Sequence, residues 1–187
     1  MGHSIVVDAC VARSAGPNRN PIAQNCYKVL LAIIQYDHRL AMSHQVESEW
    51  MEYKKRASGK IFPNASYFAL EWYQEMKSKG RVDYYLVDLD SDLRKDVEQD
   101  LINNHITKSV AKEIMEDLHL IETALKSDNR VLSSDDEMYD NLLNLQDTSQ
   151  DLNVVMWVSP NRNNAYKWLR DNAPDIPDYH ICQGAPP

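Results

Sequence analysis

The sequence predicts an α/β fold, a three-layer α/β/α sandwich around a central, mostly parallel sheet. Short apolar runs that read as buried strands alternate with segments whose apolar residues recur at helical spacing. The expected order is β-α-β-α, a helical insertion around residues 57–108, then α-β-α-β-α, which is typical of a parallel sheet between helices. A length of 187 residues predicts a single domain over residues 1–187.

The first part of the chain contains two expected strands and two expected helices. Residues 4–12 are apolar and β-branched and predict a buried strand. Residues 21–37 predict a helix, because a proline suits its first turn and apolar residues follow at helical spacing. Residues 39–43 predict a second strand. A helix is expected to begin near Ser43 and to run into the basic segment Lys54-Lys55-Arg56.

The remaining elements follow from the same two periodicities, with Gly59, Pro63 and Asn64 marking a loop. We expect a helix at 65–79, an extended segment at 82–89, a helix at 91–103, a long helix at 109–126, a strand at 130–134, a helix at 136–146, a strand at 153–158, a helix at 162–172 and an irregular tail at 173–187.

Composition limits the class of protein. No apolar run approaches the roughly 18 residues that a membrane-spanning helix needs, and the N-terminus lacks the pattern of a signal peptide. The three cysteines are an odd number without metal-ligand spacing, so free thiols in a reducing compartment are expected. The sequence therefore predicts a cytoplasmic protein without a membrane partner.

The formal net charge of −8 counts against tight, nonspecific binding to nucleic acid. Its distribution is uneven, since residues 1–80 carry ten basic and seven acidic residues and the remainder carries ten and twenty-one. The basic cluster comprises Lys54, Lys55, Arg56 and Lys60. It is expected either to follow a nucleic-acid backbone or to be a solvated helix end.

Acidic side chains lie at the ends of several expected elements, far apart in the sequence. Acids at the C-terminal ends of strands in an open α/β sheet converge on one crevice. A crevice lined with carboxylates suits hard cations such as Mg²⁺ or Mn²⁺, and the usual work of such a site is hydrolysis or transfer at phosphate esters. The candidate residues are Asp8, Glu47 or Glu49, Asp117, and Asp135 or Asp136.

Four segments, in their order along the chain, resemble the PIN-domain nucleases, which include the toxin ribonucleases of bacterial toxin–antitoxin pairs and other RNA-processing enzymes. The segments are Ser4-Ile5-Val6-Val7-Asp8, Ser43-His44-Gln45-Val46-Glu47-Ser48-Glu49-Trp50, Glu116-Asp117-Leu118-His119-Leu120-Ile121-Glu122-Thr123-Ala124-Leu125 and Val131-Leu132-Ser133-Ser134-Asp135. Counted from the serine of the second segment, Glu49 falls at the family position and Glu47 is the alternative. The acid that many members carry after the fourth segment is Asp136, Glu137 or absent.

The resemblance implies a metal-dependent endoribonuclease that hydrolyses RNA phosphodiester bonds. It implies Asp8, Glu49, Asp117 and Asp135 as catalytic residues that bind Mg²⁺ or Mn²⁺, with Asp136 as a further metal ligand. An antitoxin protein would be a partner if the chain is a toxin.

Other residues are candidates for contact with substrate. Arg13 follows the first strand and could reach a phosphate, and Ser133 could hydrogen-bond a phosphate or a metal ligand. Lys54, Lys55 and Arg56 could follow the RNA backbone. His119 is expected to be a packed structural histidine, with orientation of a carboxylate as the alternative. The aromatic residues Tyr67, Phe68, Trp72 and Tyr73 predict a core or an interface of a homodimer.

Two other functions fit the same residues. The first is a non-catalytic PIN-like module that binds RNA or protein, which the negative net charge and the open choice of a fourth acid favour. The second is a DNA-directed or structure-specific nuclease, since carboxylates and fold do not distinguish RNA from DNA.

Overall fold

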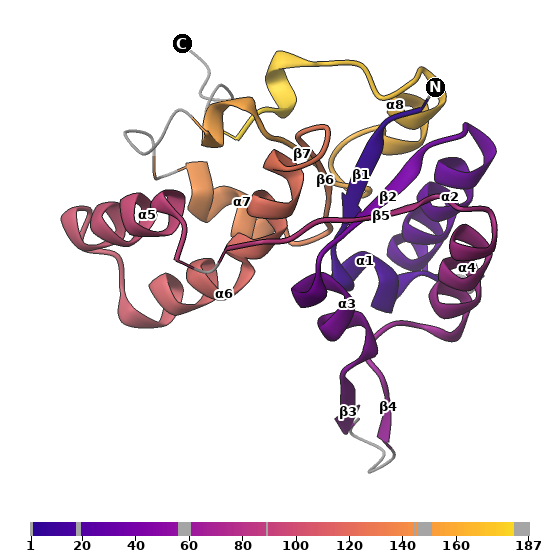
Figure 1. The fold of residues 1–187 in the computed structure, drawn as a ribbon, viewed down its shortest axis with the longest axis horizontal. Coiled ribbons are helices and arrows are strands. Elements are labelled where there is room, and N and C mark those ends of the chain that lie inside the picture. Colours follow the sequence, from indigo (N-terminus) through magenta and orange to yellow (C-terminus); the bar gives the residue numbers. More distant parts are fainter. Residues whose placement is uncertain are drawn as a thin grey trace.

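The structure is a computed structural model of the chain. It describes residues 2–17, 20–55, 61–88, 90–143, 145 and 151–181, and for Lys54, Lys55, Ile61 and Phe62 it describes the backbone alone. Figure 1 shows a central sheet with helices on both faces, which confirms the predicted three-layer sandwich.

The central sheet has five strands, and all of its strand pairs are parallel. Across the sheet the order is β5 (Val82–Tyr84), β2 (Arg39–Met42), β1 (Ser4–Val7), β6 (Arg130–Leu132) and β7 (Met156–Val158). The side chains of β1 and β6 are buried throughout, as expected for a parallel sheet covered on both faces.

Helices α2 (Pro21–Gln35), α4 (Tyr67–Ser78) and α8 (Ala165–Arg170) cover one face of the sheet. The other face is covered by α6 (Lys108–Leu125), with α5 (Asp92–Asn103) and α7 (Asp136–Leu143) packed beside it. The short helices α1 (Ala9–Ser14) and α3 (His44–Met51) begin at the C-terminal ends of β1 and β2. None of the helices in the described ranges has the length and apolar character needed to cross a membrane.

Side-chain caps explain where several helices begin. The side chain of Asn20 accepts a hydrogen bond from Ile22 N at the start of α2, and Pro21 occupies the first turn. Ser43 caps α3 and Thr107 caps α6 in the same way. The predicted helices at 21–37, 91–103 and 109–126 therefore form with small differences at their ends.

The predicted strand at 4–12 is wrong beyond Val7. The strand ends there, and α1 begins at Ala9 because the carboxylate of Asp8 accepts a hydrogen bond from Cys10 N and caps the helix. The backbone N–H of Asp8 still donates to Leu132 O of the neighbouring strand. Asp8 is therefore fixed both to the sheet and to the first turn of a helix.

The basic segment also differs from the prediction. The helix from Ser43 ends at Met51, and β3 (Tyr53–Lys55) pairs antiparallel with β4 (Ile61–Pro63) in a hairpin. Figure 1 shows this hairpin projecting from the body of the molecule. Lys54 and Lys55 lie in β3, whereas Arg56 lies outside the described residues.

The expected insertion at 57–108 is largely part of the sandwich. Helix α4 packs on α2, and Trp72 Nε1 donates a hydrogen bond to Leu30 O at 2.7 Å. Strand β5 forms the edge of the sheet, where Asp83 binds the guanidinium of Arg39 on β2. Helix α5 packs beside α6, and the β3–β4 hairpin lies outside the layers.

The last third of the chain has shorter elements than predicted. Helix α7 is described over Asp136–Leu143, and residues 144 and 146 of the predicted helix lie outside the described residues. Residues 152–154 form a 3₁₀ turn (η1) before β7. Helix α8 covers only residues 165–170. The tail predicted as irregular contains a second 3₁₀ turn, η2 (Pro177–Tyr179), and a bridge between His180 and Met156.

A buried ion pair joins α5 to α6. Arg94 donates to both carboxylate oxygens of Glu122, at 2.9 and 2.7 Å, and the side chain of Glu122 is only 5% exposed. Ser91 Oγ, at the start of α5, adds a third hydrogen bond to the same carboxylate. A buried carboxylate with this many donors is stable only while its partners remain.

We expect Arg94→Ala to lower the free energy of unfolding by about 3–5 kcal/mol, because it leaves the buried carboxylate of Glu122 without its cation. The matched control is Lys112→Ala, which breaks an exposed pair with Glu116 within α6 and should cost less than about 0.5 kcal/mol. Urea unfolding of both variants measures the difference. Equal effects would contradict a structural role for the buried pair.

Candidate functional site

The candidate site lies at the point where the strand order of the sheet reverses. From β1 the chain proceeds to β2 and β5 on one side, and it later places β6 and β7 on the other. In parallel α/β sheets, the crevice beyond the C-terminal ends of two such central strands is the usual position of a binding site. Here those ends are Val7, followed by Asp8, and Leu132, followed by Ser133.

Asp8 is buried at this point and its two carboxylate oxygens are both hydrogen-bonded. Oδ1 accepts from Cys10 N at 2.9 Å, while Oδ2 accepts from Ser133 Oγ at 2.5 Å and from Cys10 Sγ at 2.9 Å. Burial raises the pKa of Asp8, which the hydrogen bonds from Cys10 and Ser133 partly oppose, and the charge of Glu49 raises it further. Glu49 is therefore a second acid whose charge acts on Asp8 at the end of β1.

Helix α3 brings Glu49 to Asp8 through an anchor on the next residue. Trp50 is fully buried, and its Nε1 donates to Val7 O at 3.1 Å. Glu47 lies two residues before Glu49, which is a rotation of about 200° around the helix axis, so its side chain points in another direction. The carboxylate of Glu47 accepts a hydrogen bond from the Tyr73 hydroxyl at 2.6 Å. Of the two alternatives left open by the sequence, the structure places Glu49 in the group of acids.

Asp117 completes a cluster from the opposite side, since it lies in the middle of α6. Burial raises its pKa to about 7, repulsion from Asp8, from Glu49 and from Asp135 adds to this effect, and the charge of His119 partly opposes it. Its carboxylate accepts no hydrogen bond from any residue in the described ranges. Asp117 is thus a half-buried acid that faces other acids without a donor of its own.

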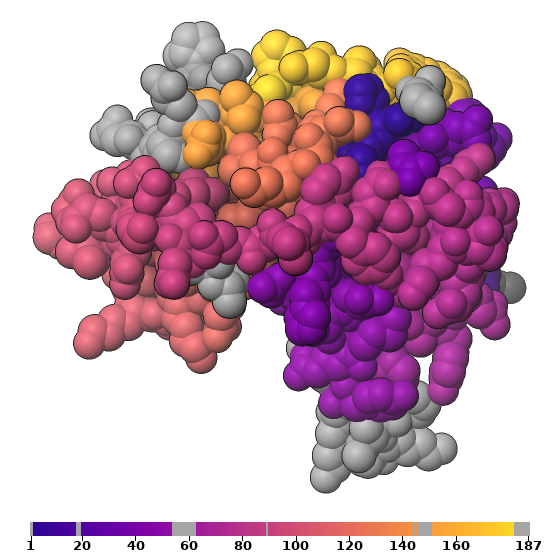
Figure 2. All heavy atoms as spheres, viewed as in Figure 1, coloured from indigo at the N-terminus to yellow at the C-terminus, as the bar shows by residue number. Residues whose placement is uncertain are grey.

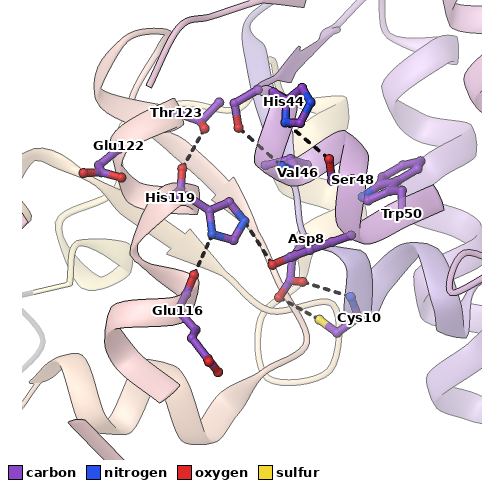
Figure 3. A network of polar contacts seen from close by, with 12 residues as sticks. Asp8, Cys10, His44, Val46, Ser48, Trp50, Glu116, His119, Glu122 and Thr123 are labelled. Atoms are coloured by element: carbon purple, nitrogen blue, oxygen red, sulfur yellow. Dashed lines mark hydrogen bonds and ion pairs between the residues drawn. The ribbon is translucent and has the colours of Figure 1, made fainter. Parts of the chain in front are cut away.

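His119 lies two residues after Asp117 on α6 and contacts Glu49. Its Nδ1 lies 2.8 Å from the carbonyl oxygen of Glu116, which can only accept, so the proton belongs on Nδ1. Nε2 lies 3.4 Å from Glu49 Oε1, an ion-pair distance whose geometry is too poor for a hydrogen bond. Figure 3 shows the ring of His119 directed from its helix towards the region of Asp8 and Cys10.

Burial opposes a charge on the His119 ring, but the contact with Glu49, the carbonyl of Glu116 and the charge of Asp117 together outweigh it and raise the pKa of His119. If the ring of His119 were neutral with its proton on Nδ1, Nε2 would present a lone pair to the carboxylate of Glu49. A further proton, on Nε2 or on Glu49, removes this repulsion. His119 is therefore buried, as expected of a packed histidine, and it also takes the alternative role of orienting a carboxylate.

Asp135 and Asp136 have different surroundings. Asp135 Oδ1 accepts from Met138 N at 2.9 Å and caps α7, and its charge acts on Asp117. Asp136 Oδ2 lies 3.0 Å from Arg162 Nε, and Arg162 also binds Asp140 with two hydrogen bonds. The structure therefore groups Asp135 with the other acids and pairs Asp136 with a cation.

Ser133 is fully buried, and its hydroxyl donates to Asp8 and accepts from Asp135 N at 3.0 Å. The structure therefore shows the hydrogen bond from Ser133 to a candidate metal ligand, whereas its contact with a substrate stays a prediction. Arg13 is exposed at the end of α1, and the hairpin carries Lys54 and Lys55.

Cys10 is a residue beside Asp8 that the sequence did not indicate as part of the candidate site. Its thiol donates to Asp8 and accepts from Ser134 Oγ at 3.0 Å and from Ser134 N at 3.2 Å. Burial, followed by the charge of Asp8, raises the pKa of this thiol well above its usual range. The sequence could have indicated Cys10 through its position, because it is the second residue of a helix that Asp8 caps. That reading requires knowing that α1 begins at residue 9.

The acids fit a hard cation by their chemistry but not as a finished binding site. Oxygen ligands are what Mg²⁺ and Mn²⁺ prefer, and a cation would relieve the repulsion that raises the pKa of Asp117. Within the described part of the chain, however, no three side chains of His, Cys, Asp or Glu are close enough together to hold a metal ion as they stand.

Figure 2 shows the surface notched between α6 on one side and α3 with the β3–β4 hairpin on the other. Glu49 of α3 and Asp117 of α6 come from the two sides of this notch. Comparison of the chain with protein-family models, with curated proteins and with solved structures finds no match.

We expect Asp117→Asn to change how stability depends on pH. The carboxyl of Asp117 has a pKa of about 7 in the folded protein and an ordinary value near 4 in the unfolded chain. The folded state holds the proton more tightly, so stability from this group is present below about pH 4 and lost as the pH rises through 7. Asparagine does not titrate, so the variant does not lose stability in this way. Its free energy of unfolding, relative to that of the unaltered protein, should rise by about 2 kcal/mol between pH 4 and pH 8, allowing for screening of a half-buried group.

Urea unfolding in EDTA at several values between pH 4 and pH 8 measures this difference. The control is Asp96→Asn, which alters an exposed acid of α5 and should give a difference that does not vary with pH. A constant difference for Asp117→Asn as well would show that Asp117 does not lie among other acids.

Proposed function

We propose that the protein is a metal-dependent endoribonuclease of the PIN type, acting in the cytoplasm. The observation that carries the proposal is the half-buried carboxylate of Asp117, which faces Asp8, Glu49 and Asp135 without a hydrogen-bond donor among the described residues. Acids with structural roles have partners, as Glu47 has in Tyr73 and Asp136 has in Arg162. An acid without a donor, set among other acids at the reversal point of a parallel sheet, suits a cation and a phosphate.

In this proposal Asp8, Glu49, Asp117 and Asp135 hold Mg²⁺ or Mn²⁺. When bound, the ion would supply an activated water and stabilise negative charge on a phosphate. The chain's own residues fix the ligands: Ser133 and Cys10 hold the carboxylate of Asp8, and His119 holds that of Glu49. Such outer contacts orient metal ligands and raise the affinity of the site.

A non-catalytic module that binds RNA or protein is the second candidate. It is favoured by the hydrogen bonds on both oxygens of Asp8 and by the lack of a ready three-ligand group within the described ranges. A DNA-directed nuclease would use the same acids. An antitoxin partner and a homodimer remain hypotheses from the sequence.

We expect Glu49→Gln to lower metal-dependent cleavage of single-stranded RNA by about 100-fold or more, because it removes a proposed ligand. Glu47→Gln is the matched control: it alters the same helix and the same charge, and its amide oxygen can still accept from Tyr73. Cleavage by this control should stay within about threefold of the unaltered protein. Rates in Mg²⁺, in Mn²⁺ and in EDTA measure the effect.

Loss of cleavage in both variants would indicate a general effect of charge on α3 and would contradict the assigned site. Absence of cleavage by the unaltered protein in both metals would favour the binding module. Cleavage of single-stranded DNA at a rate equal to that of RNA would favour the DNA-directed nuclease.

We also expect the triple variant Lys54→Ala/Lys55→Ala/Arg56→Ala to bind RNA more weakly. If all three cations contact phosphates, the slope of log Kobs against log salt should fall by about 2. The control is the triple variant Lys28→Ala/Lys77→Ala/Lys79→Ala, which removes the same charge from the α2 and α4 layer. Equal slopes for the two triple variants would exclude the hairpin from RNA binding.

A further inference from the structure

A cavity of about 330 Å³ opens where the end of α1 meets the start of α4. Arg13 and Gly16 line one side, and Ser66 and Tyr67 line the other. Since α1 begins next to Asp8, Arg13 lies about 8 Å along the helix from the candidate metal centre. A volume of this size is at the small end of ligand sites and suits one nucleotide rather than several.

Arg13 is exposed and has no acid or carbonyl partner among the residues that the structure describes. The other described arginines each bind a carboxylate or a backbone carbonyl, namely Arg39, Arg81, Arg94, Arg130, Arg162 and Arg170. In a chain with a net charge of −8, an arginine kept apart from the many acids is available to an external anion.

The aromatic side of the cavity has one packed ring and one exposed ring. Phe68 packs against Tyr27, with ring centroids 4.4 Å apart. Tyr67 beside it is 68% exposed, so its ring is free to stack on a ligand. The exposed ring of Tyr67, supported by the packed ring of Phe68, matches the flat face of a nucleobase. The guanidinium of Arg13 matches the phosphate of the same nucleotide.

We propose that this cavity binds one nucleotide of a single-stranded polynucleotide, with its base stacked on Tyr67 and its phosphate bound by Arg13. The inference rests on the proposed nuclease function and adds to it a site that holds the strand next to the proposed metal centre. A base within a duplex is stacked on its neighbours and cannot stack on Tyr67, so the cavity selects an unpaired strand. Neither contact reads the 2′-hydroxyl, so RNA and DNA strands bind alike here.

The test is fluorescence anisotropy with a labelled single-stranded RNA of ten nucleotides, in EDTA, where metal-dependent cleavage does not occur. Tyr67→Ala should weaken binding roughly 5- to 150-fold, and Tyr67→Phe should bind as the unaltered protein does. Arg13→Ala should weaken binding and lower the salt slope by about 0.7. The same losses are expected with a DNA strand of the same sequence, and the loss from Tyr67→Ala should be absent with a duplex.

The matched controls are Tyr166→Ala and Arg170→Ala, which remove an exposed tyrosine and an exposed arginine from α8 and should leave binding within about twofold. Because all four side chains reach the surface, the variants should fold, and thermal melts confirm this. No binding by the unaltered protein, unchanged binding by Tyr67→Ala and Arg13→Ala, or an equal loss with the duplex would each overturn the inference.

The outcome is separable from that of the nuclease proposal. Metal-dependent cleavage together with unchanged binding by Tyr67→Ala would retain the nuclease and reject the nucleotide site. Binding that depends on Tyr67 and Arg13, without cleavage in any metal, would retain the nucleotide site and reject the nuclease.

Discussion

The buried carboxylate of Asp8 is the constraint on which the rest of the site depends. A carboxylate that is 8% exposed is stable only if its oxygens are hydrogen-bonded. The donors come from Ser133 after β6 and from Cys10 in the first turn of α1, so one side chain joins two strand ends and a helix start. Its backbone N–H, bound to Leu132 O, aligns the same two strands.

With Asp8 fixed, the structure separates its acids into two kinds. Glu47, Glu122 and Asp136 have partners in Tyr73, Arg94 and Arg162, and these contacts hold helices and the sheet edge together. Glu49 and Asp117 reach the end of β1 from α3 and α6, where Glu49 meets His119 and Asp117 meets only other charges. The fold therefore tolerates a local repulsion that a bound cation would relieve, and such binding would stabilise the folded state.

The sequence predicted the parts of this arrangement that depend on local pattern. Helical spacing located α2, α5 and α6, with a proline at the start of α2, and an acid after an apolar run identified Asp8. It did not separate β1 from α1, because the residues that follow Asp8 are as apolar as the strand before it. The β3–β4 hairpin was missed because the pairing of Tyr53 with Pro63 is set by chain reversal and not by periodicity.

The choice between neighbouring acids could be made only from the structure, because it depends on contacts with residues far away in the sequence. The resemblance put Glu49 at the family position and left Glu47 as the alternative, and the hydrogen bond from Trp50 to Val7 fixes which of them faces Asp8. Asp135 and Asp136 were both candidate ligands until Arg162, 26 positions beyond Asp136, bound one of them. The role of Cys10 depends on Ser134, which arrives from the other side of the sheet's centre.

The most direct test of the account is an NMR titration of the Asp117 carboxyl carbon in EDTA, in the unaltered protein and in Asp135→Asn. Burial and three neighbouring acids predict a pKa of about 7 in the unaltered protein and a lower pKa once the charge of Asp135 is removed. An ordinary pKa near 4 that does not respond to Asp135→Asn would mean that the acids do not converge, and the candidate metal centre would be wrong.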